Sequence, residues 1–415
     1  MRFVSILYIV SMLVVSCKSE TKKETIQTSD VTEASEVIEN PVTGNSSLPK
    51  LFRSHDNLFL SWTEKKDTTT TLFYSTYKNG TWTPSEAIIS GTDWFVNWAD
   101  FPAIAENNGT LLTSFLQKSA KGTYTYDIKL NVYPSEEKKW NKNLLLHNDG
   151  TKSEHGFVSM LPSGDTSFFV TWLDGRNTMN GGGHDAHSEH GSGAMTLRSA
   201  IVDAKGTITE RTELDARICD CCQTSAAQTE NGPVVVYRDR SETEIRDVSI
   251  VRFVDGTWTQ PQTIGNDVWE ISGCPVNGPS VSSLNNNLAI AWFTAVNDVP
   301  KVQVVFSENN GESFGMPIQI NNGFALGRVD VAMISNTAAL VSWMETVDDT
   351  TLIKLVKVTH NGVVGAPKII SKTSAERASG FPQLEVIQDT AFVVWTAITD
   401  DASTVKIATQ PLNTL

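Results

Sequence analysis

Residues 168–174 read Phe-Phe-Val-Thr-Trp-Leu-Asp, an apolar run that ends in an aromatic residue followed by an acidic one. Six further stretches repeat this pattern, and the seven aromatic anchors are Trp62, Phe115, Trp172, Tyr237, Trp292, Trp343 and Trp395. Successive anchors lie 53, 57, 65, 55, 51 and 52 residues apart. Between them a second pair of strands is punctuated by Asn-Gly or Asp-Gly turns, as at residues 79–80 and 255–256. Four-stranded units of about fifty residues predict a β-propeller.

The predicted fold class is all-β, a seven-bladed propeller of four-stranded antiparallel blades. A six-bladed ring is the alternative if the first or last unit is degenerate. No unit can bury both of its faces alone, whereas radial stacking lets each blade cover its neighbour. The last unit supplies only three strands, and we expect residues 31–38 to provide the fourth, because Val31–Ile38 resembles Trp82–Ile88.

The first residues predict an export signal. Phe3 to Val15 is almost wholly apolar, and Val14-Val15-Ser16-Cys17 resembles the bacterial lipobox, which implies lipidation of Cys17. An ordinary signal peptide with a free cysteine is the alternative. We therefore predict a lipoprotein signal peptide over residues 1–16, a Ser/Thr/Glu/Lys-rich tether over 17–46 and the propeller over 47–415. The expected location is the bacterial cell envelope, where disulfides persist.

Composition excludes several classes of partner. The 415 residues contain 33 Lys and Arg against 47 Asp and Glu, which gives a net charge of −14. A chain without a basic cluster is a poor ligand for phosphate backbones, so no nucleic-acid partner is expected. With one long apolar run, at the N-terminus, membrane contact is expected through the lipid anchor only. We expect a monomer.

One turn carries a family resemblance. Ser307-Glu-Asn-Asn-Gly-Glu-Ser-Phe314 resembles the Asp-box of sialidase-type propellers, with Asn309 at the usual aspartate position. Residues 79–82 and 255–258 match the same motif less closely. The chain from about residue 50 to 412 thus resembles the sialidase-like (BNR-repeat) propellers, often labelled exo-alpha-sialidase. Asp-boxes stabilise turns remote from catalysis, so they indicate architecture rather than activity.

Loop lengths predict which face is functional. In a propeller, alternate connections emerge on opposite faces; here the turns inside hairpins are short, and the other connections are long and rich in charged residues. The sialidase resemblance implies three arginines that clamp a carboxylate, and carboxylates for acid–base catalysis. The candidates on the long connections are Asp100, Asp174, Arg176, Arg240, Arg246, Asp247, Arg328, Asp330 and Glu345. The alternative is that they form structural ion pairs.

Three features depart from the resemblance. Leu51-Phe-Arg53-Ser lacks the proline of the sialidase start motif. The Tyr–Glu pair of sialidases has only the candidates Tyr124, Tyr126 and Glu345. The familiar sialidase fold has six blades and no cysteine cluster. Trp94, Trp98 and Trp269 lie in the same loops and would either stack on a sugar ring or pack in the interior.

Cysteines form a second constellation. Cys219, Cys221 and Cys222 lie in one loop, and Cys274 lies in the loop that enters the next blade. Two disulfides between adjacent blades are one reading. A copper or zinc site is another, because adjacent Cys221 and Cys222 pair poorly with each other. Redox chemistry is a third.

A histidine-rich insertion is the third constellation. His184, His187 and His190 lie in the Gly-rich segment 177–193 and could chelate a transition metal, or the segment is a solvated loop. Our leading prediction is an envelope protein that binds or processes a glycan or small anionic ligand, with sialidase-like hydrolysis as its enzymatic form. A metal-binding propeller and a non-catalytic interaction scaffold are the alternatives.

Overall fold

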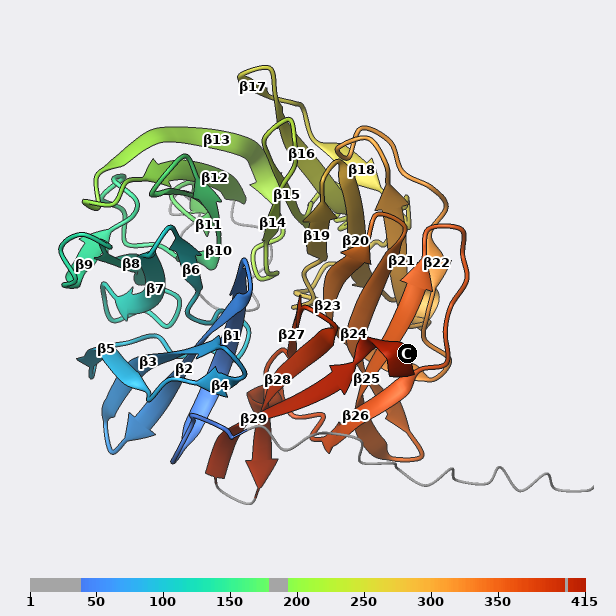
Figure 1. The fold of residues 1–415 in the computed structure, drawn as a ribbon. Helices are drawn as coiled ribbons and strands as arrows, with labels where there is room; N and C mark the ends of the chain where they lie inside the picture. The colour runs from blue at the N-terminus through green and yellow to red at the C-terminus, as the bar shows by residue number, and fades with distance from the viewer. Residues whose placement is uncertain (1–38, 179–192, 400–401) are drawn as a thin grey trace, which may run out of the picture. The chain divides into compact units, whose positions relative to one another are not determined.

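The computed structural model describes residues 39–178, 193–399 and 402–415, which form one compact unit of seven antiparallel sheets. The sheets follow one another around a ring in chain order (Figure 1). The predicted seven-bladed β-propeller is therefore confirmed, and the six-bladed alternative is wrong. Residues 31–38, the predicted closing strand, lie outside the described residues, as does the signal peptide.

The first four blades, named 1 to 4 in chain order, each have four strand positions. Blade 1 contains β1 (Ser46–Ser54), β2 (Asn57–Lys66), β3 (Thr69–Lys78), and an outer position shared by β4 (Thr81–Trp82) and β5 (Glu86–Gly91). Blade 2 contains β6 (Ile104–Asn107), β7 (Thr110–Lys118), β8 (Tyr126–Tyr133) and β9 (Asn141–Leu145). Blade 3 contains β10 (His155–Ser163), β11 (Ser167–Asp174), β12 (Met195–Val202) and β13 (Ile208–Ile218). Blade 4 contains β14 (Ser225–Gln228), β15 (Pro233–Arg238), β16 (Val248–Val254), and an outer position shared by β17 (Thr257–Trp258) and β18 (Gln262–Ile264).

The remaining blades follow the same order. Blade 5 contains β19 (Ser280–Leu284), β20 (Asn287–Thr294), β21 (Lys301–Ser307) and β22 (Ile318–Gln319). Blade 6 contains β23 (Phe324–Ser335), β24 (Ala338–Val347), β25 (Thr350–Thr359) and β26 (Lys368–Thr373). Blade 7 contains, among the described residues, β27 (Gln383–Ile387), β28 (Thr390–Thr399) and β29 (Ala402–Pro411). Short 3₁₀ turns span Val296–Asp298, Arg377–Ser379 and Leu412–Thr414.

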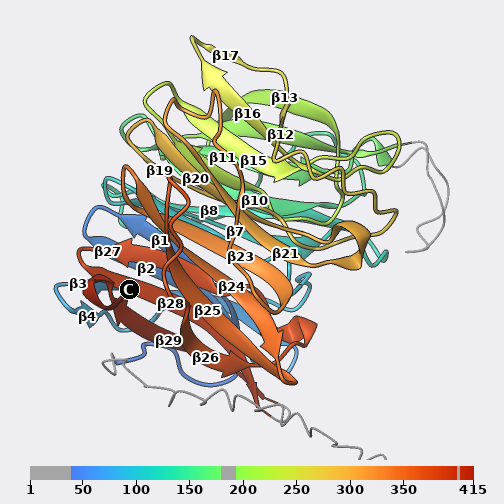
Figure 2. The ribbon, with the colours of Figure 1, turned by 90° about the vertical axis from the view of Figure 1, so that its right-hand side faces the viewer.

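The second strand of each blade carries the repeat. All seven predicted anchors fall in these strands and are buried, with Trp62, Trp292 and Trp343 fully so. These strands are apolar almost throughout because neighbouring blades cover both of their faces, as the view turned by 90° shows (Figure 2). The acidic residue after an anchor has a structural role, since the Trp343 indole Nε1 donates to Glu345 Oε2 at 2.8 Å. Trp62 with Glu64 and Trp172 with Asp174 repeat this bond.

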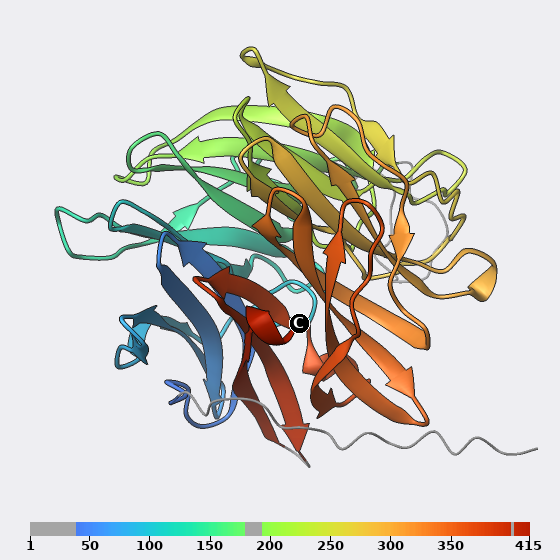
Figure 3. The ribbon, with the colours of Figure 1, turned by 45° about the vertical axis from the view of Figure 1, so that its right-hand side comes forward.

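The chain closes the ring by bringing its first and last blades together. In Figures 1 and 3 the blue β1 lies beside the red strands of blade 7. Val405 N donates to the buried Ser46 Oγ at 3.0 Å, and Leu48 N donates to Thr396 Oγ1 at 3.2 Å. Val42 packs in the same apolar cluster as Phe392. Blade 7 is thus fixed by contacts with the start of the described chain.

Antiparallel order places the connections as predicted. Turns of two to four residues join the first to the second strand in each blade, and they share one face with the connections from the third to the fourth strand, which range from two residues to the ten after β21. The positive φ angles of Asn79, Gly80, Asp255 and Gly256 suit the tight turns predicted there. The connections between blades and those from the second to the third strand therefore share the other face, called the loop face below. None of the helices among the described residues has the length and apolar character needed to span a bilayer.

Candidate functional site

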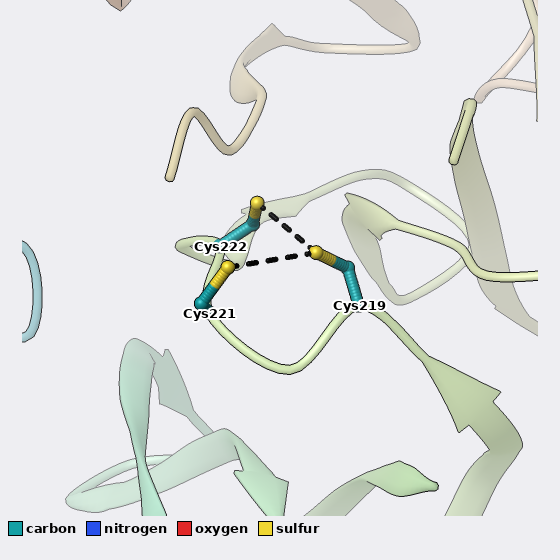
Figure 4. A group of neighbouring side chains, drawn as sticks. All are labelled: Cys219, Cys221 and Cys222. Atoms are coloured by element: carbon teal, nitrogen blue, oxygen red, sulfur yellow. Dashed lines mark hydrogen bonds between the residues drawn. The ribbon is translucent and has the colours of Figure 1, made fainter. Parts of the chain in front are cut away.

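Three cysteine side chains converge on the loop face, in the connection from β13 to β14. Cys219 Sγ lies 3.3 Å from Cys222 Sγ and 3.9 Å from Cys221 Sγ. Figure 4 shows the sulfurs pointing toward one another. Cys274, from the β18–β19 connection, is exposed, and its interaction with Cys221 lowers the pKa of the Cys274 thiol. The cysteine loop thus brings three of the cysteines named from the sequence together, and Cys274 approaches them from the neighbouring connection.

Backbone contacts hold these two connections together. Cys219 N donates to the carbonyl of Arg238 at 3.0 Å, which fixes the start of the cysteine loop against the end of β15. Gly278 lies so close to Gln223 that a Cβ would stand 2.1 Å from its carbonyl oxygen. Only glycine permits this approach, so Gly278 lets the Cys274 connection reach the cysteine loop.

A network of paired charges surrounds the sulfurs. Arg246 Nη1 lies 3.4 Å from Cys219 Sγ, and its Nη2 donates to Glu244 Oε2 at 2.7 Å. Arg240 bridges Glu244 and Asp220, with its Nη1 2.8 Å from Asp220 Oδ2. Burial opposes ionisation of the Cys219 thiol, but the Cys221 and Cys222 thiols and the Arg246 charge outweigh it and hold the Cys219 pKa well below its ordinary value. Cys219 therefore ionises more readily than an ordinary thiol.

The sulfur separations fit metal ligation better than disulfide bonding. All four thiols are free, whereas a disulfide needs an S–S distance of about 2.05 Å. Tetrahedral zinc with sulfur bonds of about 2.3 Å would separate its sulfurs by about 3.8 Å. The sulfur atoms of Cys219, Cys221 and Cys222 all lie within 4.8 Å of one another. Their separations are therefore similar to the spacing of sulfurs around a tetrahedral zinc ion. The residues present can therefore hold a thiophilic ion.

A second group of acids adjoins the cysteines. Tyr126 donates to Glu154 Oε1 at 2.5 Å and lies 3.4 Å from Asp100 Oδ2. Burial, together with the charges of Asp100, Asp220 and Cys274, raises the pKa of Glu154 to about 8, and the Tyr126 hydrogen bond opposes this shift. Burial likewise raises the pKa of Asp100 to about 7. Two carboxyls that hold protons near neutrality therefore flank the Tyr126 hydroxyl.

Backbone geometry fixes Asp100 in this group. Its Oδ1 accepts from Phe157 N at 2.7 Å, and a Cβ on Gly156 would lie 1.8 Å from its Oδ2. Asp100 thus reaches the start of blade 3 only because residue 156 is glycine.

The other residues named from the sequence have partners other than the cysteines. Asp247 accepts from Val268 N and Trp269 N, each at 2.8 Å, and so orders a loop. Asp330 accepts from Ser280 Oγ at 2.7 Å and from Leu384 N at 2.8 Å, and thereby joins three blades.

The predicted arginines are occupied by internal partners. Arg328 donates to Ser379 Oγ at 2.7 Å and to the Gly380 carbonyl at 2.9 Å, and burial with the Arg377 charge lowers its pKa to about 10. Arg176 forms a two-pronged pair with Asp174, at 2.7 Å for each bond. Glu345 pairs with Lys354 at 2.6 Å. None of these contacts forms a cluster of arginines free to clamp a carboxylate.

The candidate tryptophans pack rather than project. Trp94 stacks on Phe115 with ring centroids 4.4 Å apart, Trp98 lies 4.9 Å from the Arg328 guanidinium, and Trp269 lies 5.0 Å from that of Arg238. His184, His187 and His190 lie outside the described residues.

The first strands of the blades line a central cavity of about 190 Å³. Its wall includes Asp100, Asp330 and Glu385, with Lys50 beside them. Burial and the Asp330 charge raise the pKa of Glu385 to about 7. The cavity is therefore polar and acidic on one side.

The comparisons with known proteins concern the fold. No protein-family model and no curated protein matches the chain. Among solved structures, an ulvan lyase, a polysaccharide lyase bound to -[GlcA(1-4)Rha3S]-, is 11% identical with a TM-score of 0.55, covering 91% of this chain and 97% of that one. The chain shares its propeller fold. A Hadza microbial sialidase has 13% identity and a TM-score of 0.49, covering 84% of this chain and 75% of that one.

An alpha-L-arabinanase of Penicillium chrysogenum has 11% identity and a TM-score of 0.47, covering 89% of this chain and 94% of that one. The seven sheets and the likeness to the lyase confirm the propeller fold that the sialidase-like resemblance implied. At these sequence identities, the similarity of fold does not assign a function to any residue of this chain.

Sequence reasoning missed several members of the site. Asp220 and Glu244 lie in loops whose other residues were named, Glu154 lies in a connection from which none was named, and each became visible only through its contact with an arginine or a tyrosine. Asp220 stands between Cys219 and Cys221, so its position in the motif was the one available signal. Glu154 had no such signal.

Proposed function

We propose that this protein is a metal-binding propeller whose loop face holds one thiophilic ion, copper(I) or zinc, through Cys219, Cys221 and Cys222. The observation that carries the proposal is the convergence of three sulfurs within 4.8 Å, two of them buried. Soft thiolate ligands favour these two ions. Arg246 compensates the negative charge that ligation by three thiolates leaves, because its guanidinium lies 3.4 Å from Cys219 Sγ.

Cys274 distinguishes the two ions. Copper(I) is satisfied by three thiolates, whereas a structural zinc site takes four ligands. Cys274 interacts with Cys221 from the neighbouring blade and is the candidate for the fourth position. Ligation would then tie blade 4 to the start of blade 5.

The test is metal analysis of the full chain purified without air. We expect about one copper or zinc ion per chain, and affinity lowered about 100-fold or more in Cys219→Ser and Cys222→Ser. Cys274→Ser should keep copper(I) but lower zinc affinity about ten-fold or more. Failure of the purified and the reconstituted protein to hold either ion, together with two disulfides by mass spectrometry, would contradict the proposal.

We propose further that the protein is an envelope lipoprotein anchored through Cys17. The lipobox-like sequence Val14-Val15-Ser16-Cys17 supports this location. Thiols oxidise to disulfides in this compartment, and a bound metal would prevent that oxidation. Radiolabelled palmitate incorporation by the native chain, and its loss in Cys17→Ala, is the measurement.

A glycan or small anionic ligand is the second candidate function. One observation favours it: the Tyr126 hydroxyl lies between Glu154 and Asp100, which is the Tyr–Glu arrangement implied by the sialidase resemblance. Against it, the arginines named for the clamp are already paired. Release of a fluorophore from a sialoside should fall about 100-fold or more in Tyr126→Phe and stay unchanged in Tyr124→Phe, whose side chain is exposed. No release by the native chain would remove this candidate.

A further inference from the structure

A second group of potential ligands lies between blades 2 and 3, separate from the cysteines. Its members are two histidines and three aspartates from β8, the β9–β10 connection, β10 and β11: Asp127, His147, Asp149, His155 and Asp174. His147 and His155 are at most 3% exposed and Asp174 is fully buried. The two imidazoles stack with centroids 3.6 Å apart and planes 4° apart.

The hydrogen bonds of His155 leave a lone pair facing acids. His155 Nδ1 lies 3.3 Å from the Tyr126 carbonyl oxygen and 3.2 Å from that of Ser153. Carbonyl oxygens only accept, so Nδ1 carries the proton. In the neutral ring, Nε2 then presents its lone pair to Asp149 Oδ2 at 3.3 Å and Asp174 Oδ1 at 3.7 Å. Three acceptors that meet in a buried space are stable only with a proton on Nε2 or with a metal cation between them.

The stacked ring of His147 also has a nitrogen lone pair that faces a carboxylate. Its Nδ1 lies 2.6 Å from Asp149 Oδ1, which places the proton on Nδ1. Its Nε2 is buried without a hydrogen-bond partner and faces Asp127 Oδ1 at 3.5 Å. With the proton on Nδ1, Nε2 of the neutral His147 ring presents a lone pair toward a carboxylate, as Nε2 does in His155.

The charge balance of this group also favours a bound cation. The cations that face the group are Arg176, paired with Asp174 at 2.7 Å and 4.0 Å from Asp149, and Lys129, 3.5 Å from Asp127. Three carboxylates against these two cations leave an excess negative charge when both imidazoles are neutral. Imidazole and carboxylate are the ligands that zinc and similar divalent ions accept alongside thiolates.

We propose that a divalent ion of the zinc class binds between blades 2 and 3 through His147 and His155, with carboxylate ligands drawn from Asp127, Asp149 and Asp174. The ion links the β9–β10 connection to the ends of β8 and β11. It is independent of the thiolate ion, because the two ligand sets share no residue.

The test separates the two sites with cobalt(II) as the probe. The background chain carries Cys219→Ser, Cys221→Ser, Cys222→Ser and Cys274→Ser together with His184→Gln, His187→Gln and His190→Gln, so that neither the thiols nor the His-rich segment binds metal. We expect about one cobalt(II) per chain, with visible absorption but without the intense near-ultraviolet sulfur band. We also expect zinc to raise Tm by about 5 °C.

His147→Gln in that background should weaken cobalt binding about 100-fold and abolish the zinc-dependent rise in Tm. His360→Gln is the matched control, since His360 is a partly exposed histidine paired with Glu308 elsewhere on the surface, and it should change neither readout. A folded background chain that binds no cobalt(II) and shows the same Tm with and without zinc would overturn the proposal. So would equal binding by the His147→Gln and His360→Gln chains. Loss of the thiolate ion alone leaves this result unaffected.

Discussion

At the scale of single residues, most buried charges serve the scaffold. Glu345 and Asp174 accept from the indole of the anchor two residues earlier, and Arg328 donates to backbone oxygens of the connection before β27. A buried polar group without such a partner costs about 1–3 kcal/mol. Titratable groups that lack such a partner or compete for one are therefore informative, and examples among the described residues lie at the cysteines, at the two stacked histidines and along the central cavity.

Glu385 makes stability depend on pH. Its pKa of about 7 exceeds the ordinary glutamate value because it is buried beside Asp330, with Lys50 and Arg53 opposing. Between about pH 4.5 and 7 the folded chain therefore holds a proton that the unfolded chain releases, so stability falls as pH rises through this window. In Glu385→Gln this loss disappears, and the variant should gain about 1–3 kcal/mol relative to the native chain between pH 5 and 8.

Urea denaturation at both pH values measures the effect. Glu230→Gln, in an exposed turn, is the control and should show no such gain. Parallel stability curves for native and Glu385→Gln chains would rule out this account of the cavity.

At the scale of elements, the turn after β21 shows how a short motif acts. Asn309 Oδ1 accepts from Ser307 Oγ at 2.9 Å and from Ser313 N at 3.0 Å, while Gly311 has a φ of 78°. Phe314 packs onto the apolar cluster between blades 4 and 5. The motif therefore closes a turn and anchors it, far from the loop face.

We expect Asn309→Ala to destabilise the protein by about 1–2 kcal/mol, because two hydrogen bonds to Oδ1 are lost. Asn309→Asp keeps that oxygen and should change the free energy of unfolding by about 0.5 kcal/mol or less. Denaturant midpoints of the two variants provide the measurement. Equal destabilisation by alanine and aspartate would show that Oδ1 does not hold the turn.

At the scale of the whole molecule, stability depends on joining the two ends of the described chain. Ser46 Oγ accepts from Val405 N in a buried contact between blades 1 and 7. Each blade covers its neighbours, so an opened ring would expose apolar faces on both sides of the break.

Ser46→Ala should lower the free energy of unfolding by about 1–3 kcal/mol, because it leaves the Val405 N–H unsatisfied. Unfolding should remain one transition, followed by tryptophan fluorescence and circular dichroism together. The control is Ser47→Ala, whose hydroxyl bonds to Thr63 inside blade 1 and should matter less. A separate early transition in the Ser46 variant would mean that the ring opens without unfolding.

The candidate site was predictable in part. The cysteines were found because the two loops that carry them enter neighbouring blades, and the loop face followed from strand order. The roles of Asp247, Asp330 and Arg328 could not be read from residue type, since a charged side chain in a loop looks the same whether its partner is a ligand or a backbone group. His147 and His155 gave no spacing signal, because they meet through the packing of blade 2 on blade 3.

The sequence alone determined the number of blades, the position of each anchor and the face that carries the long connections. These follow from a period of about fifty residues and from alternation within strands, which are local properties of the chain. Only the tertiary structure decided which side chains meet: the three sulfurs with Arg246, Tyr126 with Glu154, and the stacked histidines with their aspartates. Such contacts join residues from different loops and blades, and their distances are set by how the blades pack around the closed ring.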